Sequence, residues 1–395
     1  MPTQRKGSVQ GIQRPQVHVV TGGGGFPGFS LGKKLAEKGH QVRLFDIKEP
    51  AWKLHEGMNF IQGDIRNYED VCSLIEGADV VYHMASYGMS GREQLNKKLI
   101  EEVNIGGTEN VLRACLQCNV TRLVYTSTYN VVFCGQEIRD GDESLPYVTD
   151  DKFVDHYSKT KTQADKRILA ADGTLTTNGS VLRCCVLRLA GVYGPGEQRH
   201  FPRIVSYLEQ GLVQFTYGAR DALADFLHID NLVLGHMLAA SGLTQEKEFI
   251  AAGQAYFLSD SKPVNSFEFF RPLIEGLGYK YPRINLPLGL IFYFALLTEM
   301  VHWLVRRFYN FQPILTRAEV YKTGVTHYFS TQKAKRELGY VPIVQNDFRK
   351  VVEYFIQTGH KKKKSGSSPL KHFIINLIIG FIFAAFIMSY LPLVR

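Results

Sequence analysis

The sequence predicts an α/β protein built on a doubly wound parallel sheet, with a smaller C-terminal substrate-binding part and a C-terminal transmembrane helix. Three observations support this prediction. Short apolar strands alternate with helical segments from residue 17 to residue 190, a glycine-rich loop follows the first strand, and a long uncharged segment lies near the end of the chain. The 395 residues, 45% of them hydrophobic, are enough for a substantial core.

The first half of the chain alternates between strand and helix patterns. Val17–Val20 is a short apolar strand, and a helix that follows the glycine loop is expected to stop at Gly39. Further strands are expected at residues 41–47, 59–65, 79–86, 122–128 and 181–189, with helices at residues 71–78, 101–118 and 156–169. Strands joined by helices pair in parallel, so we expect helices on both faces of the sheet.

The glycine-rich loop TGGGGFPG, residues 21–28, is the first predicted binding element. It follows a strand and opens a helix, with Gly22, Gly25 and Gly28 at the spacing G-x-x-G-x-x-G. Gly22 permits a tight turn, Gly25 lets the backbone approach a pyrophosphate, and Gly28 allows close helix packing. The helix N-terminus then presents N–H groups to the phosphates. We therefore predict a Rossmann dinucleotide site, with Phe26 among its cofactor contacts.

Asp46 ends the second predicted strand and extends this site. A carboxylate there accepts hydrogen bonds from the adenosine ribose hydroxyls and repels a 2′-phosphate, which favours NAD over NADP. Arg43 and Lys48 are the nearby cations that could reverse this preference. Asp64 and Ile65, after the third strand, are expected to flank the adenine, and a solvated turn carboxylate is the alternative for Asp64.

Tyr157 and Lys161 form the predicted chemical centre. They stand four residues apart on a predicted helix and therefore share a face. A tyrosine with a pKa near ~10 is a poor base at neutral pH, but an adjacent ammonium and an oxidised nicotinamide favour the phenolate. Tyr157 can then take an alcohol proton while hydride leaves for the nicotinamide, and Lys161 can also bond the nicotinamide ribose.

Ser127 and Thr128 end the fifth predicted strand. This is the edge at which α/β sheets bind ligands, so one of the two hydroxyls is expected to hold the substrate oxygen. The alternative is that both only cap the end of the strand.

Charge and cysteine content argue against two classes of protein. The net charge of +9 comes from the ends of the chain, because residues 1–16 and 358–395 contain basic side chains and no acid. A nucleic-acid-binding protein usually carries a basic stripe on its fold, so we expect no nucleic acid partner. Cys115 and Cys118 have a metal-like spacing, but no second such pair follows, so we expect no metal site.

The C-terminal segment is predicted to anchor the protein in a membrane. No charged residue occurs from Phe373 to Val394, and a spanning helix needs about 20 apolar residues. The cluster Lys361–Lys364 and then Lys371 precede it, which places that side and the main body in the cytosol. The endoplasmic reticulum is the expected membrane.

A second apolar stretch covers residues 286–305 and is interrupted by Glu299 and His302. A helix lying in the membrane interface, or a wall of a hydrophobic substrate site, is favoured there over a second span. The predicted organisation is a flexible N-terminus (1–15), an NAD-binding domain (16–190), a substrate-binding part (191–357), a basic linker (358–371) and the transmembrane anchor (372–394).

The chain resembles the extended short-chain dehydrogenases/reductases. The matching segments, which cover roughly residues 17–240, are TGGGGFPG, GDI, HMAS, VNIGGTENVLRAC, VYTST, YSKTK, LRLAGVYGPG and DFLHIDNLVLGHMLA. NSFEFFRPLIEGLGY and YFSTQKAKRELGYVP extend the match to about residue 345. With the apolar stretch and the membrane end, these segments resemble the 3β-hydroxysteroid dehydrogenase/isomerase branch. SYGMSGREQLN and VYKTGVTHYFS are most similar to family 42E.

This resemblance implies Tyr157 as the proton acceptor and Lys161 as its partner. The family's serine position falls on Thr128, with Ser127 beside it, and Asn104 matches a position that is more often structural. The resemblance further implies an NAD-dependent, membrane-anchored oxidoreductase of steroid biosynthesis, acting on a secondary alcohol or ketone of a steroid-like substrate. It also implies a homodimer formed through the fourth and fifth helices.

Two other functions stay open. A nucleotide-sugar epimerase or dehydratase uses the same fold and the same tyrosine and lysine, and Arg199 and Arg203 could supply its diphosphate site. The apolar stretch at residues 286–305 counts against it. A non-catalytic NAD-binding membrane adaptor would tend to lose Tyr157 or Lys161, and both are present.

Overall fold

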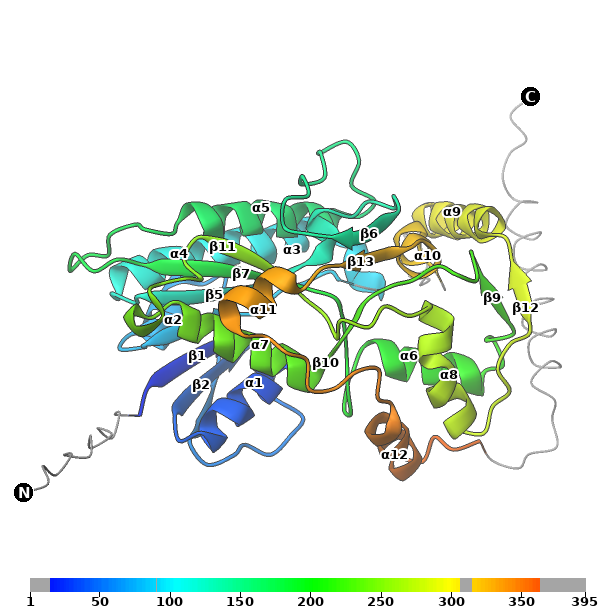
Figure 1. The fold of residues 1–395 in the computed structure, drawn as a ribbon, viewed down its shortest axis with the longest axis horizontal. Coiled ribbons are helices and arrows are strands. Elements are labelled where there is room, and N and C mark those ends of the chain that lie inside the picture. Colours follow the sequence, from blue (N-terminus) through cyan, green and yellow to red (C-terminus); the bar gives the residue numbers. More distant parts are fainter. Residues whose placement is uncertain (1–14, 90, 306–314, 363–395) are drawn as a thin grey trace, which may run out of the picture.

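A seven-stranded sheet forms the centre of the computed structural model, which describes residues 15–89, 91–305 and 315–362 (Figure 1). The strands run in the order β11-β7-β5-β4-β1-β2-β3, and every neighbouring pair is parallel. They are β1 (Val17–Thr21), β2 (Gln41–Asp46), β3 (Met58–Gln62), β4 (Val80–His83), β5 (Arg122–Thr128), β7 (Arg183–Leu189) and β11 (Gln254–Leu258). This confirms the predicted doubly wound sheet, whose order reverses between β1 and β4.

Helices cover both faces of the sheet. One face carries α1 (Phe26–Glu37) and α7 (Ile229–Gly242), and the other carries α2 (Tyr68–Ile75), α4 (Thr108–Gln117) and α5 (His156–Ala170). In β1 the neighbours Val19 and Val20 are both fully buried but belong to separate hydrophobic cores, because successive side chains on a strand point to opposite faces. A sheet buried on both faces explains why its strands are continuous apolar runs.

Two parts of this layer differ from the expected elements. The predicted helix at residues 101–118 is α3 (Lys97–Glu101), a π-helical turn η2 (Glu102–Gly107) and then α4. The seventh strand, β11, was not expected, and together with α7 it comes from beyond residue 190. The predicted boundary after residue 190 therefore separates strands that the structure places in one sheet.

The second lobe is built from short elements around an aromatic core. Its strands form three parallel pairs: β10 (Phe226–His228) with β8 (Gly191–Tyr193), β12 (Ile284–Leu286) with β9 (Phe215–Tyr217), and β13 (His327–Phe329) with β6 (Ile138–Gly141). Its helices are α6 (His200–Glu209), α8 (Ser266–Gly276), α9 (Leu288–Val305), α10 (Arg317–Gly324) and α12 (Arg349–Gln357). The helix α11 (Gln332–Leu338) instead packs on α7 and β11 in the sheet layer. The remaining short helical turns are η1 (Gly91–Leu95), η3 (Tyr129–Val131) and η4 (Gln245–Lys247).

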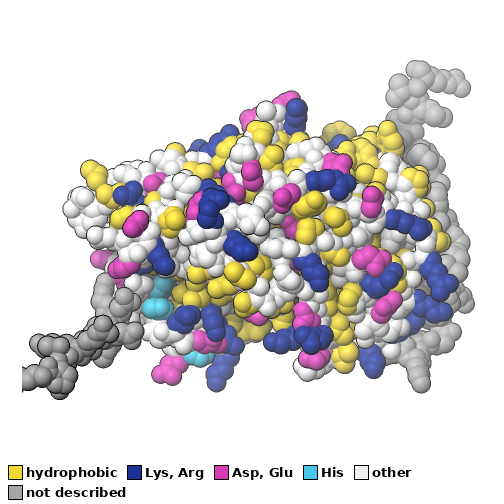
Figure 2. Space-filling model, viewed as in Figure 1, with side chains coloured by type: hydrophobic (Ala, Val, Ile, Leu, Met, Phe, Trp, Pro, Cys, Tyr) yellow, Lys and Arg dark blue, Asp and Glu magenta, His cyan; other side chains and the backbone are white. Residues whose placement is uncertain are grey.

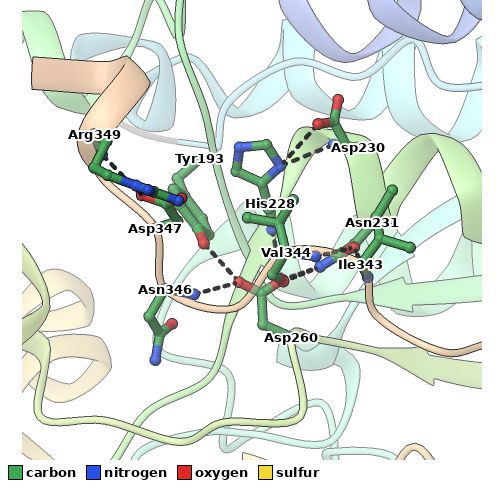
Figure 3. Close-up of polar contacts among 10 residues, drawn as sticks. All are labelled: Tyr193, His228, Asp230, Asn231, Asp260, Ile343, Val344, Asn346, Asp347 and Arg349. Atoms are coloured by element: carbon green, nitrogen blue, oxygen red, sulfur yellow. Dashed lines mark hydrogen bonds and ion pairs between the residues drawn. The ribbon is translucent and has the colours of Figure 1, made fainter. Parts of the chain in front are cut away.

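A buried carboxylate, Asp260, ties the second lobe to the sheet layer (Figure 3). It accepts hydrogen bonds from the Tyr193 hydroxyl at 2.7 Å, the Asn231 amide at 2.7 Å and the backbone N–H of His228 at 2.8 Å. The backbone N–H of Asn346 adds a fourth at 3.3 Å. These donors come from three separate parts of the chain, because His228 and Asn231 lie where β10 continues into α7, so one side chain holds β8, the β10–α7 junction and the segment before α12 together.

Asn231, whose amide donates to Asp260, extends this hydrogen-bond network to the chain before α12. Its side-chain oxygen accepts the backbone N–H of Ile343 at 2.7 Å and that of Val344 at 3.2 Å. The path of the chain from α11 into α12 is thereby fixed by two buried side chains rather than by regular secondary structure.

Within the described ranges, no helix has both the length and the apolar character needed to cross a bilayer. The predicted anchor at residues 372–394 lies outside the described residues, as do most of the basic linker and the N-terminal tail.

Replacing Asp260 with alanine is expected to lower the free energy of unfolding by about 3 kcal/mol or more, because several buried donors lose a charged acceptor. Urea unfolding followed by circular dichroism measures this change. Asp347→Ala is the matched control, since Asp347 pairs with the exposed Arg349 and should cost less than about 1 kcal/mol. Equal losses in the two variants would contradict the role given to Asp260.

Candidate active site

The glycine-rich loop forms a cradle at the carboxyl end of β1. Gly22 has φ of +74°, and a Cβ there would lie 2.8 Å from the backbone nitrogen of Ala85. A Cβ at Gly28 would lie 2.3 Å from the carbonyl oxygen of Gly22. Side chains are therefore excluded where α1 meets the loop, and the backbone stays open to a ligand. This shape fits the pyrophosphate of a dinucleotide, which Gly22, Gly25 and the start of α1 at Phe26 would hold.

Asp46 closes the adenosine end of the cradle. Its carboxylate accepts the backbone N–H of Gly24 at 3.1 Å and that of Lys48 at 3.3 Å. Burial raises the pKa of Asp46, while these N–H groups oppose the shift. The carboxylate is thus oriented at the end of β2, where the ribose hydroxyls of NAD would reach it.

Arg43, one of the cations that could have favoured NADP, is used elsewhere. Its guanidinium donates to the carbonyl oxygens of Leu74 at 2.8 Å and Glu76 at 2.6 Å, at the C-terminal end of α2. The Arg43 guanidinium therefore caps α2 and is not available to bind a 2′-phosphate, which supports the preference for NAD.

Asp64 and Ile65, which were predicted to flank the adenine, follow β3 as expected, but their side chains differ in their surroundings. Asp64 forms an ion pair with Arg66 at 2.6 Å, and the guanidinium lowers the pKa of this carboxyl. Ile65 is 5% exposed and packs in the hydrophobic core on the face of the sheet that α2 and α4 cover. Phe26 packs against Trp52, with ring centroids 6.2 Å apart. Asp64 is thus already neutralised by a local partner.

The N-terminus of α5 carries Tyr157 and is held from two sides. Asp155 caps the helix by accepting the backbone N–H of Ser158 at 2.7 Å. Its other oxygen pairs with the ammonium of Lys322 on α10 at 3.0 Å. The start of α5 is therefore anchored to the second lobe, one turn before Lys161.

Lys161 is 2% exposed and points into the sheet. Its ammonium donates to the carbonyl oxygen of Thr126 at 2.6 Å and lies 4.1 Å from the centroid of the Tyr125 ring. Burial lowers the pKa of Lys161 to about 7, and the negative charge of Asp165 opposes the shift. Lys161 therefore stays protonated beside the end of β5 at neutral pH only because Asp165, the Thr126 carbonyl and the Tyr125 ring stabilise its ammonium group.

Tyr157 is 5% exposed at the same edge. Burial raises its pKa to about 12, while the positive charge of Arg199 and a hydrogen bond with the Ser86 side chain act in the opposite direction. The phenol therefore keeps its proton at neutral pH unless further positive charge arrives. Ser86 was not among the predicted site residues, although it belongs to the HMAS segment that ends the fourth predicted strand, and Arg199 was named only as a possible diphosphate ligand.

The structure separates the two hydroxyls at the end of β5. Ser127 donates its hydroxyl to the carboxylate of Asp165 at 2.7 Å, on the face covered by α5. Thr128 accepts the backbone N–H of Asn130 at 3.3 Å, and among the described residues no acceptor takes its hydroxyl hydrogen. Thr128 therefore keeps a free hydroxyl donor at the strand end, whereas the Ser127 hydroxyl is committed to Asp165 on α5.

A buried ion pair lies behind this edge and was missed by the sequence analysis. Arg188 on β7 contacts Asp165 on α5 at 3.1 Å, and the two residues are 3% and 0% exposed. Tyr147 donates its hydroxyl to the same carboxylate at 2.7 Å. Two signals were available: an aspartate one turn after Lys161 on the same helix face, and a charge inside an apolar strand.

Asn104 joins three elements next to Tyr157. Its side-chain oxygen accepts the backbone N–H of Tyr87 at 2.8 Å, and its amide donates to the Thr160 hydroxyl at 3.0 Å. The π-helical turn η2 that contains Asn104 thereby links the loop after β4 to α5. These contacts agree with the structural role that the resemblance implies.

Comparison with known proteins gives three similarities. The profile of the 3-beta hydroxysteroid dehydrogenase/isomerase family matches residues 19–288. Short-chain dehydrogenase/reductase family 42E member 1 of Danio rerio is 55% identical over 377 residues, covering 95% of this chain and 97% of the relative. A 3 beta-hydroxysteroid dehydrogenase/Delta 5-->4-isomerase of Mycobacterium tuberculosis is 34% identical over 355 residues, covering 87% of this chain and 92% of the relative.

Among solved structures, UDP-glucose 4-epimerase of Thermotoga maritima has a TM-score of 0.65 at 19% identity. The match covers 87% of this chain and 99% of the epimerase. At this identity the likeness concerns the fold.

Replacing Asp46 with alanine is expected to weaken NAD binding by about 10- to 100-fold, because two hydrogen bonds to a charged acceptor are lost. Discrimination against NADP should weaken at the same time. Calorimetric titration with each cofactor measures both effects. Asp64→Ala serves as the control and should change NAD affinity by less than about 5-fold, since Asp64 already pairs with Arg66. A larger effect at Asp64 than at Asp46 would contradict this assignment.

Proposed function

The chain belongs to the 3-beta hydroxysteroid dehydrogenase/isomerase family and is an NAD-dependent oxidoreductase, and from this premise we propose that its substrate is a secondary alcohol or ketone on a steroid-like molecule. The observation that carries the proposal is the burial of Tyr157 and Lys161 on one helix, α5, with the Lys161 ammonium at the end of β5, the strand that also carries Thr128. Tyrosine and lysine in this arrangement suit proton transfer to and from an alcohol oxygen.

Each residue of the site has one task in the proposed oxidation. Thr128 donates a hydrogen bond to the substrate oxygen and fixes its position. Tyr157, as phenolate, accepts the hydroxyl proton, and NAD, when bound, would supply the hydride acceptor and a positive charge. Lys161 stabilises the phenolate through space from its place on the Thr126 carbonyl. In the reverse direction, Tyr157 returns the proton to the ketone oxygen.

The electrostatics of the second lobe support an uncharged substrate over a nucleotide sugar. Arg203 forms an ion pair with Glu319 at 2.8 Å, and Arg199 lies 3.7 Å from Glu93. Arg203 is therefore already matched by a largely shielded carboxylate, whereas the Arg199 pair is exposed and weak. Releasing Arg203 would cost the energy of its pair, so a nucleotide-sugar substrate is the less favoured alternative.

We also propose that the protein associates with the endoplasmic reticulum membrane. The outward face of α9 is apolar over its length, with exposed side chains spaced at helical intervals. They are Leu290, Tyr293, Phe294, Leu297, Met300 and Trp303. Residues 286–305 would lie in the interface and residues 372–394 would form the anchor. The homodimer implied by the resemblance stays a prediction.

Tyr157→Phe is expected to lower turnover by about 10²- to 10⁴-fold and to leave NAD affinity nearly unchanged, because it removes the proton acceptor alone. The full chain in detergent is mixed with NAD and a 3β-hydroxy-5-ene steroid, and NADH absorbance is followed. Tyr293→Phe makes the same chemical change at an exposed position and should keep full activity. Retained turnover in Tyr157→Phe would refute the mechanism, and no turnover by the unmodified protein would refute the steroid class.

Thr128→Ala and Ser127→Ala are expected to differ although the residues are adjacent. Thr128→Ala should lower kcat by about 10²-fold, because the substrate oxygen loses its hydrogen-bond donor. Ser127→Ala should change kcat by less than about 5-fold but lower the free energy of unfolding by about 1–2 kcal/mol, because buried Asp165 loses a donor. Steady-state kinetics and urea unfolding separate the two effects. The opposite ranking of kcat would show that Ser127 holds the substrate.

A further inference from the structure

A groove of about 930 Å³ lies in the second lobe, between α8, the β9–β12 pair and the loop at residues 279–283. None of its lining residues belongs to the glycine-rich loop or to the Tyr157–Lys161 site. The volume lies in the range of small-molecule sites in proteins. The groove is therefore a second concave surface, separate from the chemistry described above.

The groove has a positive lining. Four cations, Arg220, Arg271, Lys280 and Arg283, face two carboxylates, Glu268 and Glu275. Glu268 forms an ion pair with Arg271 at 3.1 Å. Among the described residues, no carboxylate pairs with the other three cations, and all three are exposed. The groove thus has cationic groups that are not neutralised by the protein itself.

Arg271 is held in place inside the groove. Its guanidinium lies 4.0 Å from the centroid of the Tyr281 ring, and its Nε is buried with no hydrogen-bond partner in the described part of the chain. A stacked guanidinium has lost most of its rotational freedom before any ligand arrives.

The neutral polar side chains of the groove are already occupied. The Asn285 amide donates to the carbonyl oxygen of Gly218 at 3.0 Å, and the Asn265 amide donates to that of Ala222 at 3.1 Å. Both amides therefore hold the walls of the groove in position. Recognition is left to the cations and to the aromatic rings, which suits a phosphate carried on an organic group.

The groove adjoins the start of α9 along the chain, because Arg283 and Asn285 line it and α9 begins at Leu288. Arg283 precedes β12, and β12 is followed at once by α9, whose exposed residues include Tyr293 at 69% and Trp303 at 64%. Tyrosine and tryptophan are the residues enriched where bilayer and water meet. Figure 2 shows apolar side chains over α9 and, below them, Lys and Arg side chains at the edge where Figure 1 draws β12.

We propose that this groove binds the headgroup of an anionic phospholipid while α9 lies in the membrane interface. The phosphate meets Arg220, Lys280 and Arg283, beside Arg271, which Glu268 and the Tyr281 ring already hold, and the acyl chains extend toward the apolar face of α9. The adjoining apolar face favours a lipid over a free phosphate compound, because a soluble ligand needs no apolar neighbour. The inference rests on the membrane association proposed above and is independent of the proposed reaction.

The test uses the full chain in neutral detergent and calorimetric titration with dioctanoyl phosphatidylserine. Binding is expected for this lipid, with an affinity that falls as salt is raised, and not for dioctanoyl phosphatidylcholine. In the variant Arg220→Gln/Lys280→Gln/Arg283→Gln, affinity should fall about tenfold or more. The three side chains are exposed, so the fold should persist, and NAD-linked turnover should be unchanged.

The matched control removes the same charge elsewhere. Lys38→Gln/Lys247→Gln/Lys335→Gln replaces three exposed lysines outside the groove that form no ion pair among the described residues, and it should bind the anionic lipid like the unmodified protein. Equal losses in both triple variants would overturn the proposal, as would equal binding of the two lipids. Binding of inorganic phosphate as tight as that of the anionic lipid would also overturn it and indicate a soluble ligand. Absence of steroid turnover refutes the proposed reaction alone.

Discussion

The buried ion pair between Asp165 and Arg188 is the interaction on which the site depends. Both side chains are almost completely shielded from water, so each carries a desolvation cost that only its partner and further hydrogen bonds can offset. The Ser127 and Tyr147 hydroxyls provide those bonds at 2.7 Å each. Because Asp165 stands on α5 and Arg188 on β7, satisfying this pair sets the position of α5 against the sheet. Tyr157 and Lys161, on the same helix, are placed as a consequence.

The same pair influences the charge state of Lys161. Burial alone would favour a neutral amine, and the carboxylate one turn along the helix raises the pKa of Lys161 against that effect. The Thr126 carbonyl and the Tyr125 ring add a direct acceptor and a π face. A lysine that keeps its proton in an apolar layer therefore needs contacts from β5 and α5 together, which explains why the site sits where these elements meet.

The second lobe is also connected to α5, the helix that carries Tyr157 and Lys161. The ion pair of Asp155 with Lys322 ties the start of α5 to α10, and α10 packs against α9. Asp260 and Asn231 hold the chain that leads into α12 (Figure 3). The lobe that carries the apolar face of α9 and the cationic groove is thus connected to the chemical centre through charged side chains as well as through the backbone.

The sequence by itself determined the Rossmann-type sheet, the glycine cradle, Asp46 and the pairing of Tyr157 with Lys161. These are local patterns, set by alternating polarity, by glycine spacing and by the four-residue helical repeat. Only the tertiary structure decided that Ser127 and Thr128 face different partners, that Arg43 caps α2, and that β11 joins the sheet. Those outcomes depend on partners far away in the chain, such as Asp165 for Ser127 and Leu74 for Arg43, and no local pattern encodes which distant group will occupy the facing position.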